Sequence, residues 1–220
     1  MFEGKKIILV GNSVEILNYK YGKIIDSYDT IIRMGRGIPN PNGVEDNTQA
    51  IGTKTHVWVT GFLRENMSKE KHIKKVPLKL LNRTRMYMKS PREPNYLKDF
   101  TTMFTDNQIL EIYDEFGFKN TNDKSDPQYG RPSNGFITLL WLTRKCSYHS
   151  ITLIGFDFFA KYYPINVGKA KPQSWHLPHN THTSTPHRSE IERDYALKLY
   201  GEGVIKWIIL SNLKEEVLDF

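Results

Sequence analysis

Apolar and polar positions along the chain follow two patterns, which together predict strands separated by helices. Short, nearly continuous apolar runs that end at polar or glycine-rich turns are typical of buried strands. They predict strands at residues 6–10, 30–34, 54–61, 150–157 and 204–210. Apolar residues three and four positions apart predict helices within residues 14–29, 104–117, 131–147 and 187–203. Residues 78–89 are predicted to be helix followed by strand, and Gly, Pro and Asn mark residues 35–52 as a loop.

The order of these elements predicts a single α/β domain. Strands that alternate with helices and are apolar throughout are typical of a mostly parallel sheet with helices on both faces. A chain of 220 residues is long enough for one such domain with its own core. Ligands of these folds bind at the carboxyl ends of the strands, so polar side chains predicted at those ends are candidate functional residues.

The first such group is the turn Gly11-Asn12-Ser13, which ends the apolar stretch "KKIILVGNS" of residues 5–13. A strand followed by a tight polar turn is a common place to hold a nucleotide. The further glycines of the dinucleotide fingerprint and a Walker lysine are both missing. Capping of the following helix by Asn12 or Ser13 is an equally good explanation of the turn.

The second group is "GRPSNG", residues 130–135, directly before an apolar helix. The first backbone amides of that helix, with Ser133 and Asn134, suit a phosphate or a ribose. Helix capping is again the structural alternative. A third candidate is Asp157, which ends a predicted buried strand and has either a structural or a ligand-binding role.

His187 is the candidate for proton transfer, because it opens the predicted helix of residues 187–203. A helix dipole disfavours the charged form of a histidine near its N-terminus, which leaves a neutral imidazole able to accept a proton. An exposed histidine without a role is the alternative. His176, His179 and His182 are spaced as His-x-x-His-x-x-His, but they fall in a proline-containing loop without a Cys or Asp cluster, so no metal site is predicted.

The net charge indicates what kind of partner the protein binds, and the cysteine content indicates its cellular compartment. The net charge of +7 and a pI of about 9.3 suit a polyanionic partner such as nucleic acid, and basic residues cluster within residues 64–92. The single cysteine, Cys146, excludes an intrachain disulfide and suits a reducing cytoplasm. No apolar run approaches the length of a membrane span and no leader peptide is visible, so a cytoplasmic enzyme is expected.

Three motifs in order resemble those of the sialyltransferases, which are glycosyltransferase family 29, and also those of the bacterial sialyltransferases of family 42. "ILVGNSVEILNYKYGKIIDSYDTIIRMGRG", continued by "IGTKTHVWV", resembles the long sialyl motif, with its signature positions at Gly11, Asn12, Asp26, Asp29, Arg33, Met34, Gly52 and Thr53. "RPSNGFITLLWL" with "SITLIGFDFF" resembles the short motif, with Pro132, Ser133, Gly135 and Gly155 in place. His187 followed by Glu192 is similar to the final His-x4-Glu motif.

The resemblance implies a Rossmann-like variant of the GT-A fold that transfers a sugar from a nucleotide donor by inversion, without metal. It implies that His187 is the general base, paired with Glu192 as the second catalytic residue. Donor and phosphate contacts are expected from Gly11, Asn12, Ser13, Arg33, Thr60, Arg131, Ser133, Asn134, Gly135, Asp157, Tyr162, Tyr163 and His176. No cofactor beyond the nucleotide sugar is expected.

The sequence also departs from the pattern of these families. Gly35 stands where the long motif usually has an asparagine that touches the nucleotide, and Thr60 aligns near a second such asparagine. The cysteine pair that joins the long and short motifs is missing, as is the membrane anchor of the Golgi enzymes. A UDP-linked donor is therefore as open as a CMP-linked one.

Three functions follow from these observations. The leading hypothesis is transfer of a sugar to a hydroxymethylated base in DNA, as in some phage enzymes, which the basic charge favours. The alternatives are a sialyltransferase acting on a surface glycan and an inactive module that binds nucleotide or nucleic acid. Residues 1–220 are expected to form one domain, with an acceptor-side insertion at 62–129 and a lid loop at 160–186.

Overall fold

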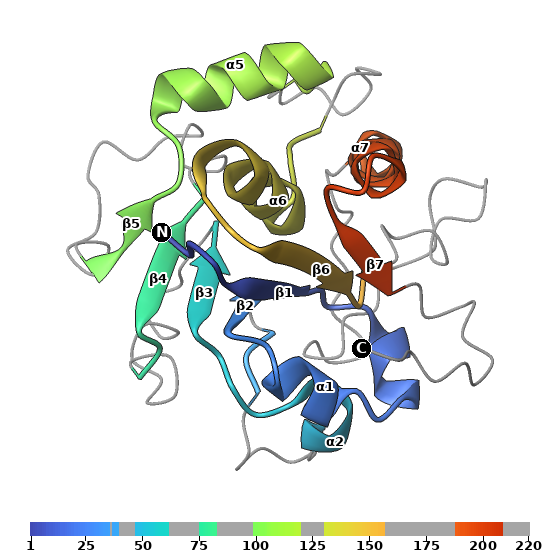
Figure 1. The fold of residues 1–220 in the computed structure, drawn as a ribbon. Helices are drawn as coiled ribbons and strands as arrows, with labels where there is room; N and C mark the ends of the chain where they lie inside the picture. The colour runs from blue at the N-terminus through green and yellow to red at the C-terminus, as the bar shows by residue number, and fades with distance from the viewer. Residues whose placement is uncertain are drawn as a thin grey trace, which may run out of the picture.

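The computed structural model describes residues 1–35, 37–39, 47–61, 75–82, 99–119, 130–156 and 188–208. These residues form an α/β domain (Figure 1). Its strands are β1 (Lys6–Val10), β2 (Thr30–Met34), β3 (Val57–Thr60), β4 (Leu78–Leu81), β5 (Thr101–Thr102), β6 (Ser150–Ile154) and β7 (Lys206–Ile208). Its helices are η1 (Val14–Asn18), α1 (Gly22–Asp26), α2 (Thr48–Ile51), α5 (Asp106–Phe116), α6 (Asn134–Lys145) and α7 (Ser189–Gly201).

The seven strands form one sheet in the order β5-β4-β3-β2-β1-β6-β7, and every neighbouring pair is parallel. The prediction of a Rossmann-like parallel sheet is confirmed. From β1 the chain adds strands outward to β5 and then returns to place β6 on the other side of β1. The carboxyl ends of β1 and β6 therefore flank the point where the strand order reverses, and this is where open α/β sheets bind ligands.

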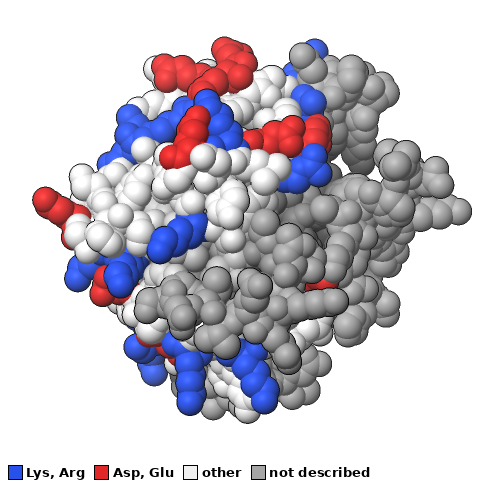
Figure 2. All heavy atoms as spheres, turned by 45° about the vertical axis from the view of Figure 1, so that its right-hand side comes forward, with Lys and Arg blue, Asp and Glu red and all other residues white. Residues whose placement is uncertain are grey.

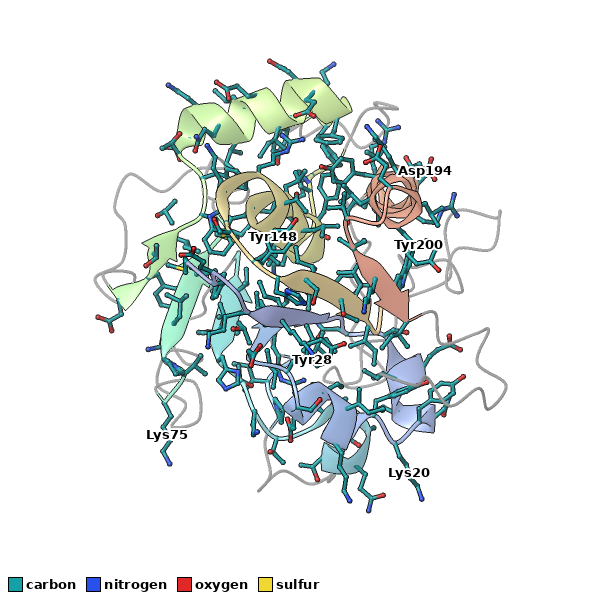
Figure 3. All side chains as sticks on the ribbon, viewed as in Figure 1. Lys20, Tyr28, Lys75, Tyr148, Asp194 and Tyr200 are labelled. Carbon is teal, nitrogen blue, oxygen red and sulfur yellow. The ribbon has the colours of Figure 1, made fainter. Side chains whose placement is uncertain are left out.

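Helices cover both faces of the sheet, as the apolar strands predict. Figure 1 shows α5, α6 and α7 on one face and η1, α1 and α2 on the other. A hydrophobic core lies on each face of the sheet, and β1 contributes side chains to both. Ile7 and Leu9 pack on the α6 side, whereas Ile8 and Val10 pack on the α1 side. Tyr28 lies on the α1 side beneath β1 (Figure 3), where its hydroxyl donates to Thr152 Oγ1 at 3.1 Å. The two buried layers hold the strand ends in fixed positions.

The predicted helix signals at residues 104–117 are confirmed. Thr105 is the N-cap of α5 and forms a capping box with Gln108. Gly117 ends the helix in the left-handed conformation, with φ of 64°. α7 ends at Gly201, within the predicted range, and its C-cap is Glu202 in the right-handed helical conformation.

Other element predictions are corrected. Leu78–Leu81 is strand β4 and not the start of a helix, because these apolar residues complete the sheet beside β3. Residues 14–29 contain two short helices, η1 and α1, and the predicted loop 35–52 contains α2. β6 ends at Ile154, three residues before the predicted end at Asp157. β5 was not predicted, because a strand of two residues has no detectable hydrophobic periodicity. The predicted insertion 62–129 contributes β4, β5 and α5 to the domain itself, whereas the predicted lid 160–186 lies outside the described residues.

Candidate active site

The first turn of α6 lies at the carboxyl ends of three strands. Asn134 Oδ1 accepts a hydrogen bond of 2.9 Å from Nδ2 of Asn82, the residue after β4. A Cβ on Gly61, directly after β3, would lie 2.8 Å from the same oxygen. A Cβ on Gly35, directly after β2, would lie 4.0 Å from Asn134 Nδ2. The sequence therefore brings a helix N-terminus and a polar amide to the edge of the sheet where ligands bind.

The turn after β1 reaches the same region. Asn12 Nδ2 donates to the carbonyl oxygen of Met34, the last residue of β2, at 3.3 Å. Its Oδ1 faces Gly37, where a Cβ would lie 2.0 Å away. The turns that carry Asn12 and Asn134 thus both lie against the residues that follow β2.

Gly11 and Gly155 allow the ends of β1 and β6 to approach closely. The Gly11 N–H donates to Ile154 O at 2.8 Å and the Ser13 N–H to Gly155 O at 3.1 Å. A Cβ on Gly11 would lie 2.1 Å from the Gly155 carbonyl oxygen, a distance that no side chain tolerates. The two glycines of the long and short motifs therefore let the ends of β1 and β6 lie in direct contact at the strand-order reversal.

Glu192, in the first turn of α7, is tied to the N-cap of α6. Its carboxylate accepts from the Ser133 backbone N–H at 2.7 Å and from Ser133 Oγ at 2.5 Å, while Ser133 Oγ also accepts from the Phe136 N–H at 3.1 Å. The side chain is fully buried, and this burial raises the pKa of Glu192 to about 8 although the two bonds from Ser133 oppose the shift. The contact fixes the start of α7, immediately after His187 and Arg188 in the sequence, against the first turn of α6.

Replacing Glu192 with glutamine is expected to stabilise the protein at alkaline pH. The carboxyl pKa is raised from 4.5 to about 8 in the folded state, so its stabilising contribution is full below pH 4.5 and declines as the pH rises through about 8. Glutamine keeps the shape but cannot ionise, so E192Q should gain on the order of 2 kcal/mol over the parent at pH 8.5 and little at pH 4.5. Urea denaturation at both pH values measures this difference. E111Q, at an exposed glutamate on α5, is the control, and equal pH dependence of E192Q and the parent would contradict the prediction.

Several signature residues of the long motif support the scaffold. Arg33 is fully buried in β2, and its Nε and Nη2 donate to the backbone carbonyls of Lys54 and Ile51. Burial lowers the pKa of Arg33 to about 10, against the opposing charge of Asp26. The carboxylate of Asp26 accepts from the Thr53 backbone N–H at 2.8 Å and from Thr53 Oγ1 at 2.9 Å. Arg33 thus holds the loop after α2, and its predicted contact with the donor stays a prediction.

Some of the other predicted donor residues lie in the described part of the chain, and the rest lie outside it. Ser13 caps η1, accepting from the Glu15 N–H at 3.3 Å, and Thr60 ends β3 as a buried residue. Arg131 lies close enough to Tyr113 for its charge to oppose the burial that raises the pKa of Tyr113 to about 12. The remaining predicted site residues lie outside the described part of the chain: Asp157, Tyr162, Tyr163, His176 and His187.

Sequence reasoning missed three residues that shape the site. Asn82 follows a strand that was predicted as helix, so its place at a strand end was hidden. Trp58, inside β3, donates from Nε1 to the Gly35 carbonyl oxygen at 2.6 Å and so holds the turn after β2. The ring of Phe156 lies 2.6 Å from the position of a Cβ on Gly135. A polar residue after a short apolar run was the only available signal for Asn82.

The described residues also bear on three other properties, which are surface charge, metal binding and the spanning of a membrane. Figure 2 shows that the described part of its face carries Lys and Arg interspersed with Asp and Glu. Within the described ranges, no three His, Cys, Asp or Glu side chains gather as ligands for a metal ion. His176, His179 and His182 are outside those ranges. None of the described helices has the length and apolar character to cross a membrane.

Comparison with known proteins agrees with this architecture. The model of glycosyltransferase family 29 (sialyltransferase) matches residues 4–204, whereas no curated protein matches the chain. The sialyltransferase Cst-I of Campylobacter jejuni is similar in fold, with 16% identity, a TM-score of 0.57 and coverage of 98% of this chain and 78% of that chain. CstII of C. jejuni, solved with the substrate analogue CMP-3FNeuAc, has 16% identity, a TM-score of 0.52 and coverage of 94% and 80%. A mammalian sialyltransferase, solved with Gal-beta-1-3GalNAc-ortho-nitrophenol, has 17% identity, a TM-score of 0.52 and coverage of 93% and 69%.

The family match and the parallel sheet thus show a sialyltransferase-like glycosyltransferase that uses a nucleotide sugar. The family match extends over most of the chain, from the strand before Gly11 to the end of α7. The chain belongs to glycosyltransferase family 29, as the three motifs in the sequence predict.

Proposed function

We propose that this enzyme transfers sialic acid or a related sugar from a CMP-linked donor to a hydroxyl group of a glycan, with inversion and without a metal ion. The observation that carries the proposal is the placement of the first turn of α6 over the ends of β2, β3 and β4, next to the turn of Asn12. Solved relatives of the same fold support it, because one holds CMP-3FNeuAc and another holds Gal-beta-1-3GalNAc-ortho-nitrophenol.

In this proposal the first turn of α6 binds the phosphate of the donor. The backbone N–H groups of Asn134 and Gly135 have no hydrogen-bond partner in the described part of the chain, because they are the first two of α6. Unpaired N–H groups and the positive end of the helix dipole both favour an anion. As the sugar leaves its phosphate, negative charge grows there, so the same groups stabilise the transition state.

His187 is proposed to be the general base that removes the proton from the acceptor hydroxyl. It directly precedes Arg188, the N-cap of α7, and α7 is anchored to the α6 turn through Glu192 and Ser133. Glu192 has both carboxylate oxygens on Ser133 and is buried, so we assign it a positioning role for α7 rather than proton transfer with the substrate.

A binding screen tests the donor assignment. Thermal shift is measured with CMP, UMP and GMP, since a ligand that binds only the folded state raises Tm. CMP is expected to give the largest rise, and CMP-sialic acid is then expected to transfer its sugar to galactose-terminated oligosaccharides in the presence of EDTA. Stronger binding of UMP, or a requirement for a divalent cation, would contradict the proposal.

The acceptor needs its own experiment, because the DNA hypothesis rests on basic charge, small size, an expected cytoplasmic location and altered nucleotide contacts in the motifs, and it gains no support from the comparisons. The enzyme and donor are incubated separately with galactose-terminated oligosaccharide and with DNA containing hydroxymethylated cytosine. Product on the oligosaccharide supports the proposal, whereas product on DNA would restore the DNA hypothesis.

Asn12→Ala is expected to weaken donor binding with little loss of stability. The Asn12 amide lies at the reversal of strand order, and among the described residues it donates one hydrogen bond, to Met34 O. Removing a side chain that contacts the nucleotide should raise Kd for CMP by about 5- to 20-fold, the range expected for hydrogen bonds to a polar or charged ligand. Calorimetric titration measures Kd, and Asn107→Ala on the exposed face of α5 is the control. Unchanged affinity for CMP in the Asn12 variant would remove Asn12 from the donor site.

A further inference from the structure

Two asparagine side chains from different elements meet at the carboxyl edge of the sheet. Asn82 follows β4 and is 1% exposed, and its Nδ2 donates to Oδ1 of Asn134 in the first turn of α6 at 2.9 Å. Gly61 makes room for the pair, since a Cβ there would lie 2.8 Å from Asn134 Oδ1 and 3.5 Å from Asn82 Nδ2. The contact therefore depends on the ends of β3 and β4 and on α6 together.

The direction of this hydrogen bond decides which end of the Asn134 amide faces the site. An amide oxygen only accepts and an amide nitrogen only donates. With its oxygen held by Asn82, Asn134 directs Nδ2 toward the turn after β2, 4.0 Å from the Cβ position of Gly35. Gly35 has no side chain between its backbone and Asn134. The Asn134 nitrogen, a hydrogen-bond donor, therefore lies next to the Gly35 backbone.

The Asn134 nitrogen is one of three donors that this single turn offers. The other two are the backbone N–H groups of Asn134 and Gly135, and none of the three has a partner in the described part of the chain. If the Asn134 amide were reversed, the turn would present an oxygen that only accepts in place of this donor, and such an oxygen repels an anionic ligand oxygen. The orientation set by Asn82 thus matters most for a ligand that accepts hydrogen bonds.

We propose that Asn82 is a positioning residue for donor binding: it holds the Asn134 amide so that its nitrogen donates to a phosphoryl oxygen of the nucleotide sugar. This inference rests on the proposed function, which supplies the nucleotide at this edge of the sheet. Asn82 acts through Asn134 and has no contact with substrate in this role.

A double-mutant cycle with CMP as the probe tests the inference. N82L removes the hydrogen bond to Asn134 but keeps a side chain of similar size, and we expect Kd for CMP to rise about 5- to 10-fold. N134A should also weaken CMP binding, and adding N82L to N134A should then change Kd less than about twofold, because the residue through which Asn82 acts is gone. An unchanged Kd in N82L, or the same loss in both backgrounds, would overturn the proposal. N107L on α5 is the matched control and should bind CMP like the parent.

A pH series with N82D gives a second readout, which also serves if N82L fails to fold. The introduced carboxyl group can still donate to Asn134 Oδ1 while it is protonated, whereas its ionised form only accepts and turns the Asn134 amide around. The Kd of N82D relative to the parent is therefore expected to rise from acidic to alkaline pH. A constant ratio would overturn the positioning role. Binding of CMP by the parent is the separate test of the proposed function, and if neither CMP, UMP nor GMP binds the parent, the proposed function falls first and this inference with it.

Discussion

Replacing His187 with alanine is expected to lower kcat by about 10²- to 10⁴-fold, because loss of a general base removes proton transfer from the transition state. KM for the nucleotide sugar should change little, since the base acts on the acceptor hydroxyl. Initial rates at saturating acceptor, with the donor varied, separate the two constants. Thermal stability should stay close to that of the parent, because the contact between Glu192 and Ser133, which holds α7 to α6 in the described part of the chain, is kept in this variant.

Variants of the other histidines make this prediction specific. His176→Ala, His179→Ala and His182→Ala are compared with His187→Ala under the same conditions. A near-normal kcat in His187→Ala together with a large loss in one of the others would move the base to that histidine. Partial recovery of His187→Ala by added imidazole would further support the assignment.

Ser133→Ala is expected to cost about 2–4 kcal/mol of stability, the largest stability effect predicted for this enzyme. The hydroxyl caps α6 through the Phe136 N–H, and loss of such a cap typically costs about 1 kcal/mol. It also leaves the buried Glu192 carboxyl without one of its two partners, which adds about 1–3 kcal/mol. For a chain of this size Tm should fall by about 5–15 °C.

Two variants control for this result. Ser133→Thr keeps the hydroxyl and should recover most of the stability. Thr143→Val removes a hydroxyl that donates to Leu139 O near the other end of α6, and it should cost less than about 1 kcal/mol. If Ser133→Ala cost no more than Thr143→Val, the α6–α7 anchor would be a minor contact. Since the bonds from Ser133 lower the pKa of Glu192, the Ser133→Ala deficit should also grow as the pH rises.

The sequence predicted the parts of this fold that depend on neighbouring residues. The ends of α5 follow from Thr105 and Gly117, because capping and the left-handed turn are local. The ends of β1 and β2 follow from apolar runs that stop at polar turns. β4 was misassigned because Leu78, Leu80 and Leu81 fit both a helix and a strand, and only the neighbouring β3 decides between them.

For the candidate site, the sequence located polar groups but not their contacts. Ser133 was predicted as a helix cap or a ligand residue, and the structure shows the cap together with a partner 59 positions away, Glu192. Arg33 was predicted from its motif to contact the donor. The contacts that the structure describes for it are hydrogen bonds to the backbone carbonyls of Lys54 and Ile51. Contacts across such separations depend on the packing of whole elements, which residue spacing does not encode.

The first turn of α6 holds both flanks of the chain segment between Phe156 and Arg188. On one side the Phe156 ring packs at Gly135, and on the other Glu192 is bonded to Ser133. Because both contacts are made with the same turn, a change that shifts the start of α6 displaces Phe156 and Glu192 together. A substitution in this turn is therefore felt at two places that are 36 positions apart in the sequence.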